Sequence, residues 1–106
     1  MLKGMVYHIL TSAEWERARS NSTYTPPAFE QEGFIHLCDE DQIAGVIERY
    51  FPEPEDLVAL CIKPEQLNAE LRYENLLGGE EQFPHLYGPL NLDAVLDVQP
   101  IRNWVR

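Results

Sequence analysis

Short apolar runs separated by polar turns dominate the chain, and they predict several strands and few helices. Residues 5–10, 33–38 and 57–62 combine aliphatic, aromatic and β-branched side chains in the way that buried strands do. The run at 57–62 is apolar at every position, so we expect both of its faces to be buried. Residues 71–74 predict a brief alternating strand, and residues 92–98 predict a last strand.

Helical spacing appears twice in the first half of the chain. Thr11 and Glu14 have the spacing of a capping box, in which each side chain satisfies a free backbone donor, and they predict a short helix over 12–20. A second capping box at 39–42 leads into apolar residues at helical intervals, until two prolines end the pattern. Between the two helices, segment 21–28 contains serine and two adjacent prolines and predicts a loop.

Proline and glycine residues interrupt the regular patterns in the later part of the chain. Pro64 predicts a short helical turn, and Gly78 and Gly79 break the strand before them. Segment 83–90 mixes two prolines and a glycine with aromatic and imidazole rings, which favours a constrained loop or an edge strand over a core strand. Two early β-α units followed mostly by strands predict an α+β fold with two short helices early in the chain, formed as a single domain over 1–106.

Composition indicates a globular protein and narrows the range of its partners. The hydrophobic fraction of 44% suffices for a core, and the apolar runs are far shorter than the roughly twenty residues of a membrane span. The first residues show no signal-peptide pattern, so we expect a cytoplasmic protein without membrane contact. Eight basic residues are scattered among eighteen acidic ones, and the net charge of −10 disfavours non-specific binding to nucleic acid. The pattern does not define an oligomeric state.

The three histidines are the first candidates for chemistry. His8 and His36 lie in two of the apolar runs, and His85 lies in the proline-containing segment, where a ring can be held toward a cleft. A histidine in an apolar strand is commonly a packed core residue, but all three share a setting of aromatic, glycine or proline neighbours. We therefore expect them to line one small-molecule cleft, where imidazole can donate or accept a proton near neutrality.

Charged and aromatic side chains extend this candidate site. Glu74 and Glu81 flank the glycine pair just before His85, and either could orient a histidine or a ligand hydroxyl, with solvated surface acids as the alternative. Arg72 is a candidate for contact with an anion, or for surface ion pairing instead. Three aromatic rings that could stack on a planar ligand, or pack in the core, belong to Tyr7, Phe83 and Tyr87.

A bound metal ion is a further hypothesis, because imidazole and thiolate are good zinc ligands. The ligands would be His8, His36, Cys38 and His85. Their spacing matches no C-x-x-C or H-x-x-x-H pattern, so we assign no metal ligand. Cys38 and Cys61 lie in apolar runs and are expected to be buried, reduced thiols.

Three motifs resemble those of a small bacterial family of unknown function, whose members are of about this length. They occupy residues 6–9, 32–36 and 83–90, and the last is the most specific. The resemblance implies an ADP-ribosyltransferase-like fold, in which a split mixed or antiparallel sheet has a cleft between its halves.

That fold carries implications for individual residues. Tyr7 and His8 are similar to the Tyr-His pair that contacts a ribose in NAD-using transferases, and His36 has a setting resembling that of a second histidine in RNA 2′-phosphotransferases. The late glutamate of the transferases is matched loosely by Glu74 or Glu81.

The leading hypothesis from the sequence is a histidine-lined cleft for a nucleotide-like small molecule, NAD or ADP-ribose, in a protein that acts as a transferase. His8 would bind a ribose hydroxyl, His36 a phosphate or second hydroxyl, and His85 would serve as acid or base. The alternatives are a non-catalytic binding or interaction module on the same fold and a metal-dependent enzyme.

Overall fold

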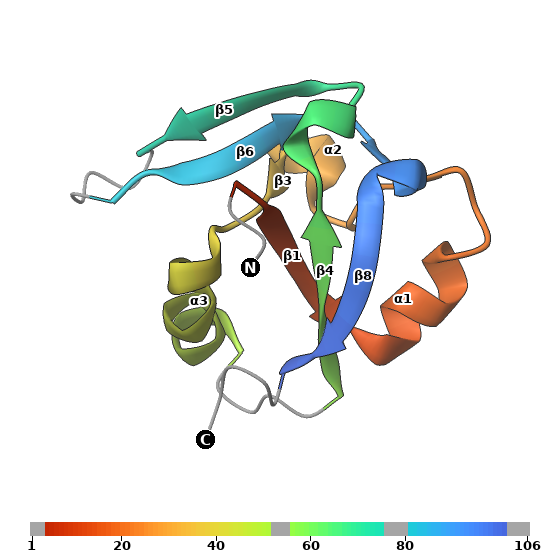
Figure 1. Cartoon of the computed structure of the whole chain (residues 1–106), viewed down its shortest axis with the longest axis horizontal. Helices are drawn as coiled ribbons and strands as arrows, with labels where there is room; N and C mark the ends of the chain where they lie inside the picture. The colour runs from red at the N-terminus through yellow and green to blue at the C-terminus, as the bar shows by residue number, and fades with distance from the viewer. Residues whose placement is uncertain (1–3, 52–55, 76–80, 102–106) are drawn as a thin grey trace.

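The computed structural model describes residues 4–51, 56–75 and 81–101, and these form an α+β structure with antiparallel strand pairs (Figure 1). The strands are β1 (Val6–Thr11), β2 (Thr23–Tyr24), β3 (Ile35–His36), β4 (Leu57–Ile62), β5 (Glu70–Glu74), β6 (Phe83–Tyr87), β7 (Leu90–Asn91) and β8 (Val95–Pro100). The helices are α1 (Ser12–Ala18), α2 (Phe29–Glu32) and α3 (Ile43–Tyr50), with 3-10 turns at Glu40–Gln42, Pro64–Gln66 and Leu92–Ala94.

The strands form two three-stranded sheets and one two-stranded sheet. Their orders are β1-β4-β8, β3-β6-β5 and β2-β7. The two larger sheets meet where Tyr7 and Cys38 exchange backbone hydrogen bonds of 2.7 and 2.8 Å. Beyond this bridge β1 and β3 diverge, so the segment that contains β3 belongs to one sheet at Ile35 and touches the other at Cys38.

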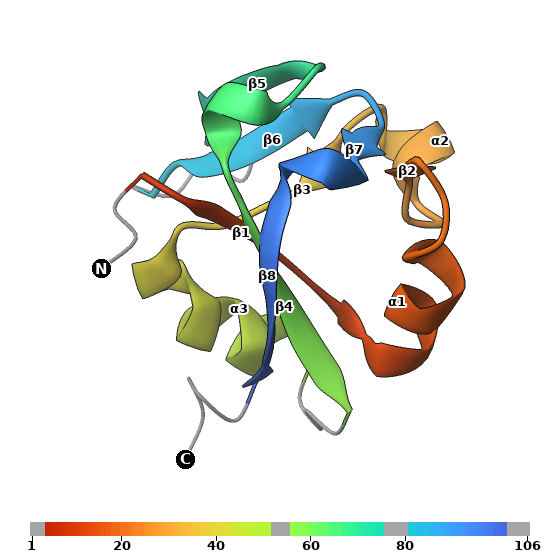
Figure 2. The same ribbon diagram turned by 45° about the vertical axis from the view of Figure 1, so that its right-hand side comes forward.

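Alternation along β1 sends its side chains into two cores. Val6 and Leu10 point toward a core that α1 covers and that extends under β3 and β6. Tyr7 and Ile9 point the other way, into a core covered by α3. Figure 2 shows the two helices on opposite sides of β1, β4 and β8. The prediction that the 57–62 run is buried on both faces is confirmed, because alternate residues of β4 belong to the two cores.

Of the two predicted capping boxes, that at 39–42 forms with both of its bonds, whereas at Thr11 the side chain caps the first helix. The backbone N–H of Glu14 donates to the Thr11 hydroxyl over 3.1 Å, and the backbone N–H of Asp39 donates to Oε1 of Gln42 over 2.9 Å. The first helix ends at Ala18, two residues before its predicted end, because the N–H of Asn21 bonds to the Ala18 carbonyl and turns the chain toward β2.

Segment 21–28 was predicted as a loop, and that prediction is wrong at two residues. Thr23 and Tyr24 form β2, which pairs with β7. The prediction of two early helices also omits α2, and Gly33, expected to open a strand, instead ends α2 in the left-handed region at φ 81°. Glycine adopts this conformation without the steric penalty that other residues meet there. No side-chain cap marks the start of α2, so capping rules could not reveal it.

The preference for a loop or edge strand over 83–90 is also wrong, because β6 is the central strand of its sheet. Pro84 is tolerated there because it lies at the end of the ladder with β3. Leu37 donates its N–H to the Pro84 carbonyl over 3.0 Å, and the reciprocal bond is the one that proline cannot make. A single hydrogen bond is therefore lost, and the pairing of β3 with β6 stays short.

The last predicted strand begins later than expected. The 92–98 segment opens with the 3-10 turn, and β8 carries a bulge at Leu96, because Ile62 pairs with Val95 while Cys61 pairs with Asp97. The break predicted at Gly78 and Gly79 lies outside the described residues. No helix among the described residues is long and apolar enough to span a membrane.

Candidate functional site on the β3-β6-β5 sheet

The candidate site is formed by side chains that alternate with the core residues Ile35 and Leu86 on the β3-β6-β5 sheet. We call it the histidine face, and its members are Phe34, His36, Arg72, Glu74, His85 and Tyr87. The strand register places His85 directly between His36 of β3 and Arg72 of β5. Residues far apart in the chain therefore form one row across the sheet.

A hydrogen-bonded chain of Tyr87, Glu74 and His85 lies at the centre of the histidine face. One carboxylate oxygen of Glu74 accepts from the Tyr87 hydroxyl over 2.6 Å and from Nδ1 of His85 over 2.9 Å. The hydroxyl bond and then the imidazole bond lower the pKa of Glu74, and the same hydroxyl bond raises the pKa of Tyr87. Because a carboxylate only accepts, Nδ1 of His85 carries a proton that it donates to Glu74.

The His85 ring is enclosed by other rings. Only 4% of His85 is exposed. Phe34 stacks on it with 4.3 Å between centroids and 22° between planes, and the His36 ring meets it edge-on at 5.3 Å. The described residues provide no hydrogen-bond partner for Nε2 of His85, and none of their buried side-chain nitrogens or oxygens lacks a partner. The Nε2 atom therefore reaches the surface of the histidine face.

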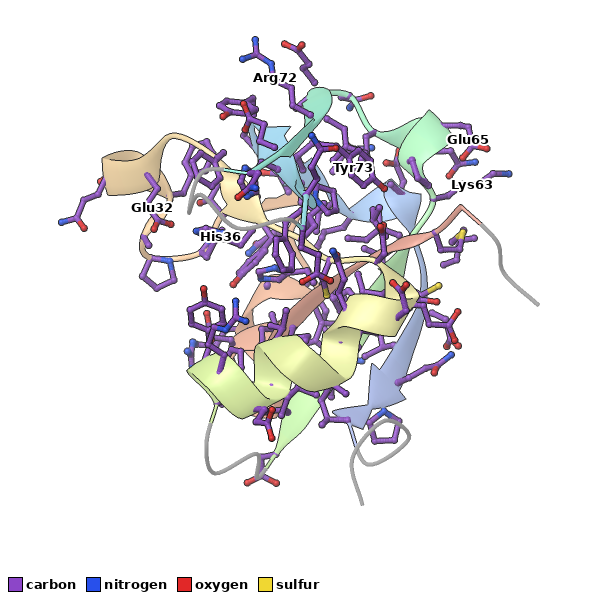
Figure 3. The ribbon with its side chains drawn as sticks, turned by 90° about the vertical axis from the view of Figure 1, so that its left-hand side faces the viewer. Glu32, His36, Lys63, Glu65, Arg72 and Tyr73 are labelled. Atoms are coloured by element: carbon purple, nitrogen blue, oxygen red, sulfur yellow. The ribbon has the colours of Figure 1, made fainter. Side chains whose placement is uncertain are left out.

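His36 is the solvent-facing imidazole of the row. Its Nε2 lies 3.1 Å from a carboxylate oxygen of Glu32, and 61% of its side chain is exposed. Figure 3 shows the two labelled side chains next to each other beside α2. Glu32 is the last residue of α2, and Gly33 turns the chain so that the carboxylate and the imidazole face each other. Each of the two neighbouring imidazoles thus has its own carboxylate partner.

His8 joins the site through the backbone of His36. Its Nδ1 donates to the His36 carbonyl over 2.9 Å, at the free edge of β3 where β1 and β3 diverge. The ring lies on the core side of β1, 5.6 Å from the Tyr24 ring, and burial lowers its pKa. His8 is therefore a neutral ring that ties the two sheets together. The sequence led us to expect all three histidines around one cleft, whereas the rings that lie beside each other are those of His36 and His85.

The structure separates two of the predicted site residues, Tyr7 and Glu81, from the histidine face. Tyr7 packs in the core under α3, where burial and a hydrogen bond to Cys61 raise its pKa. Phe83 lies opposite Glu74 in the β5-β6 pairing, at the margin of the face, and packs against the same core. Glu81 is exposed and accepts a 3.3 Å hydrogen bond from the Gln42 side chain.

Arg72 belongs to the histidine face but is committed to neighbouring groups. It makes two hydrogen bonds of 3.0 and 3.1 Å to Glu70, and its guanidinium lies 4.7 Å from the centroid of the Tyr87 ring. Two residues were not predicted, Phe34 of the histidine face and Glu32, which is the carboxylate partner of His36. Both could have been found from spacing, because Phe34 is two residues before His36 on the same strand face and Glu32 is four residues before it.

Two surface hollows of the described part of the chain are lined by residues outside the histidine face. They have volumes of about 80 and 470 Å³ and lie beside α3 and between α1 and β8, and neither is lined by a histidine. The described residues contain no group of three or more His, Cys, Asp or Glu side chains placed to hold a metal ion. Cys38 and Cys61 are buried free thiols, and burial raises the pKa of Cys38 to about 12.

Fold and site together define a small α+β protein whose antiparallel sheet displays two carboxylate–histidine pairs. The chain belongs to a family described as proteins of unknown function, DUF952, whose pattern matches residues 9–98. It is similar to the crystal structure of protein CC0527 from Caulobacter crescentus, with 33% identity, a TM-score of 0.78, and coverage of 89% of this chain and 82% of that one. The solution NMR structure of CC0527 gives 32% identity, a TM-score of 0.76, and coverage of 91% and 83%. No curated protein matches the chain.

Proposed function

We propose that the histidine face binds a nucleotide-like small molecule of the NAD or ADP-ribose type, with His85 as general acid or base. The observation that carries the proposal is the Tyr87–Glu74–His85 chain. It fixes the imidazole in one orientation and one tautomer and leaves Nε2 at the surface. A carboxylate that orients a histidine in this way is the arrangement that many acid–base catalysts use.

The neighbouring side chains complete the proposed binding surface. The half-buried rings of Phe34 and Tyr87, 5.4 Å apart, offer aromatic surface for a planar base. His36 contacts a hydroxyl group beside His85. His8 acts indirectly and does not contact the ligand, because its bond to the His36 carbonyl sets the position of β3. In this proposal Glu74, and not Glu81, is the glutamate that the resemblance to transferases suggested.

We also propose that the two larger sheets are the halves of an ADP-ribosyltransferase-like split sheet. The support is the antiparallel pairing within each sheet and the divergence of β1 and β3 beyond the Tyr7–Cys38 bridge. In this proposal the ligand lies on the β3-β6-β5 half, because that half holds the exposed imidazole.

Isothermal titration of the purified protein with NAD and with ADP-ribose tests the proposed function. We expect binding in the micromolar to millimolar range that weakens at least about tenfold in His85→Asn, which keeps a donor for Glu74 but removes Nε2. Glu65→Gln is the matched control, because Glu65 is exposed and Figure 3 shows it at the opposite end of that view from His36. The absence of heat, and of any thermal stabilisation, at millimolar ligand would exclude the proposal.

A non-catalytic binding module is the second candidate, and the enclosure of His85 favours it. The Phe34 ring covers one face of the imidazole, and 4% exposure leaves little room for a reacting atom. NAD consumption by the wild type, measured beside binding, separates the two candidates. Turnover that is lost in Glu74→Ala and retained in Glu81→Ala supports an enzyme, whereas binding without turnover in all three proteins supports the module.

A further inference from the structure

We propose that the histidine face recognises the nucleoside part of its ligand, and that it prefers a positively charged base to a phosphate group. This inference rests on the function proposed above and names the ligand class of the same site. It follows from the balance of charges on the face, from its free hydrogen-bond acceptors and from its aromatic rings.

The charges on and beside the histidine face are mainly negative. Glu32, Glu70 and Glu74 contribute three carboxylates, against the single guanidinium of Arg72. That guanidinium already makes two hydrogen bonds to Glu70 and lies over the Tyr87 ring, so it has little to offer a phosphate. The whole chain carries −10, which adds repulsion against an anion. A phosphate group would therefore be repelled both by the nearby carboxylates and by the net negative charge of the chain.

The free polar atoms of the face are acceptors, which suit the hydroxyl groups of a ribose. Both bonds to Glu74 use the same carboxylate oxygen, and the other oxygen has no partner among the described residues. With Nδ1 facing Glu74, Nε2 is the ring nitrogen of His85 that is left for a ligand, and it lies at the surface although its residue is more than nine-tenths buried. An uncharged imidazole that donates through Nδ1 accepts through Nε2. Two adjacent hydroxyls of a ribose can donate to these two acceptors, whereas a phosphate oxygen has no proton to offer at neutral pH.

The rings of the face provide a place for the base. Phe34 and Tyr87 are half-buried, with their centroids 5.4 Å apart and their planes at 45°. His85 stacks on Phe34 and the Arg72 guanidinium lies over Tyr87, so a base would lie against the remaining surface of these rings. Aromatic faces attract a cation more strongly than a neutral ring of the same shape. With Glu32 and Glu74 on either side of the imidazole row, this attraction adds to that of the carboxylates.

Three ligands that share the adenosine scaffold and differ in charge provide the test. They are 1-methyladenosine, which is positive at neutral pH, adenosine, which is neutral, and AMP, which is negative. By isothermal titration we expect 1-methyladenosine to bind most tightly and AMP most weakly, with at least about a tenfold difference between them. The affinity for 1-methyladenosine should fall as salt is raised from about 50 to about 300 mM. 2′,3′-Dideoxyadenosine, which lacks both hydroxyls, should bind at least about tenfold more weakly than adenosine.

Two substitutions test whether the carboxylates beside the histidine face cause the preference for the positively charged base. Glu32→Gln should reduce the preference for 1-methyladenosine over adenosine by about threefold, while Glu65→Gln should leave it unchanged. If AMP or ADP-ribose binds more tightly than adenosine through its phosphate, this inference is overturned while the proposed function stands. If none of these ligands and neither NAD nor ADP-ribose binds, both fail. A dideoxy analogue that binds as well as adenosine would overturn the role of the ribose hydroxyls.

Discussion

Replacing His8 by asparagine removes a proton-binding group from the junction of the two sheets while keeping a donor for the His36 carbonyl. Nδ1 of His8 lies 2.9 Å from that oxygen, and the side-chain nitrogen of asparagine is positioned relative to the backbone as Nδ1 is. The substitution loses the packing of the imidazole beside Tyr24. We therefore expect the free energy of unfolding to fall by about 1–2 kcal/mol near neutral pH.

The effect of acid distinguishes the two proteins. Burial lowers the pKa of His8 in the folded protein below the value of 6.5 that applies in the unfolded chain. Between those two pKa values the unfolded state binds more protons, so the stability of the wild type decreases as the pH falls below about 6.5. The slope is up to about 1.4 kcal/mol per pH unit. At about pH 5 the wild type has lost up to about 2 kcal/mol through His8, and His8→Asn has lost none of this contribution.

Urea unfolding, followed by the fluorescence of Trp15 where it packs against the core, measures both stability profiles. Glu14, which interacts with His8 electrostatically, and the other carboxylates are present in both proteins, so the difference between the two profiles reports the change at His8. Profiles that stay parallel within about 0.5 kcal/mol from neutral pH to about pH 5 would refute the conclusion that the folded protein holds His8 as a buried neutral ring.

Three further predictions concern packing and reactivity. Leu86→Ala should lower the free energy of unfolding in urea by about 3 kcal/mol, because the side chain is fully buried. Leu96, with 52% exposure, is the control, and Leu96→Ala should change that free energy by less than about 0.5 kcal/mol. Equal losses in the two variants would contradict the placement of Leu86 in the core. A Cβ atom at Gly88 would lie 2.6 Å from Cβ of Ala69, so Gly88→Ala should lower stability by about 1–3 kcal/mol, and adding Ala69→Gly should recover most of the loss. Burial raises the pKa of Cys38 to about 12. A thiol reagent at about pH 8 should therefore label Cys38 at least about a hundredfold more slowly in the folded protein than in the urea-unfolded chain. Equally fast labelling of the folded protein would contradict this prediction.

Local patterns in the sequence identified the parts of the fold that depend on near neighbours. The helix cap at Thr11 and the capping box at Asp39 involve residues three positions apart, and the apolar run of β4 is long enough to define a strand buried on both faces. The position of β6 depends instead on pairing with β3 and β5 across the chain, which composition does not encode. Pro84 favoured an edge strand, because proline has no N–H to donate within a sheet. Only the strand register shows that its position at the end of the β3-β6 ladder costs a single hydrogen bond.

The candidate site was predictable in its residue types and less so in its geometry. Alternation alone places His85 and Tyr87 on one face of their strand. No local rule sets the register that brings His36 beside His85, or chooses Glu74 over Glu81 as the partner of the imidazole. Glu74 is selected because the β5-β6 pairing brings it within reach of Nδ1 of His85, whereas Glu81 precedes β6 and lies against Gln42.

The segment that carries His36 is anchored at two places only a few residues apart. Leu37 bonds to Pro84 of one sheet, and Cys38, next in the chain, bonds to Tyr7 of the other. A change that displaces the backbone at His36 must therefore twist a peptide segment held on both sides, and the strain reaches the Tyr7–Cys38 bridge. The exchange rates of the Tyr7 and Cys38 amide hydrogens with heavy water should accordingly respond to such a displacement.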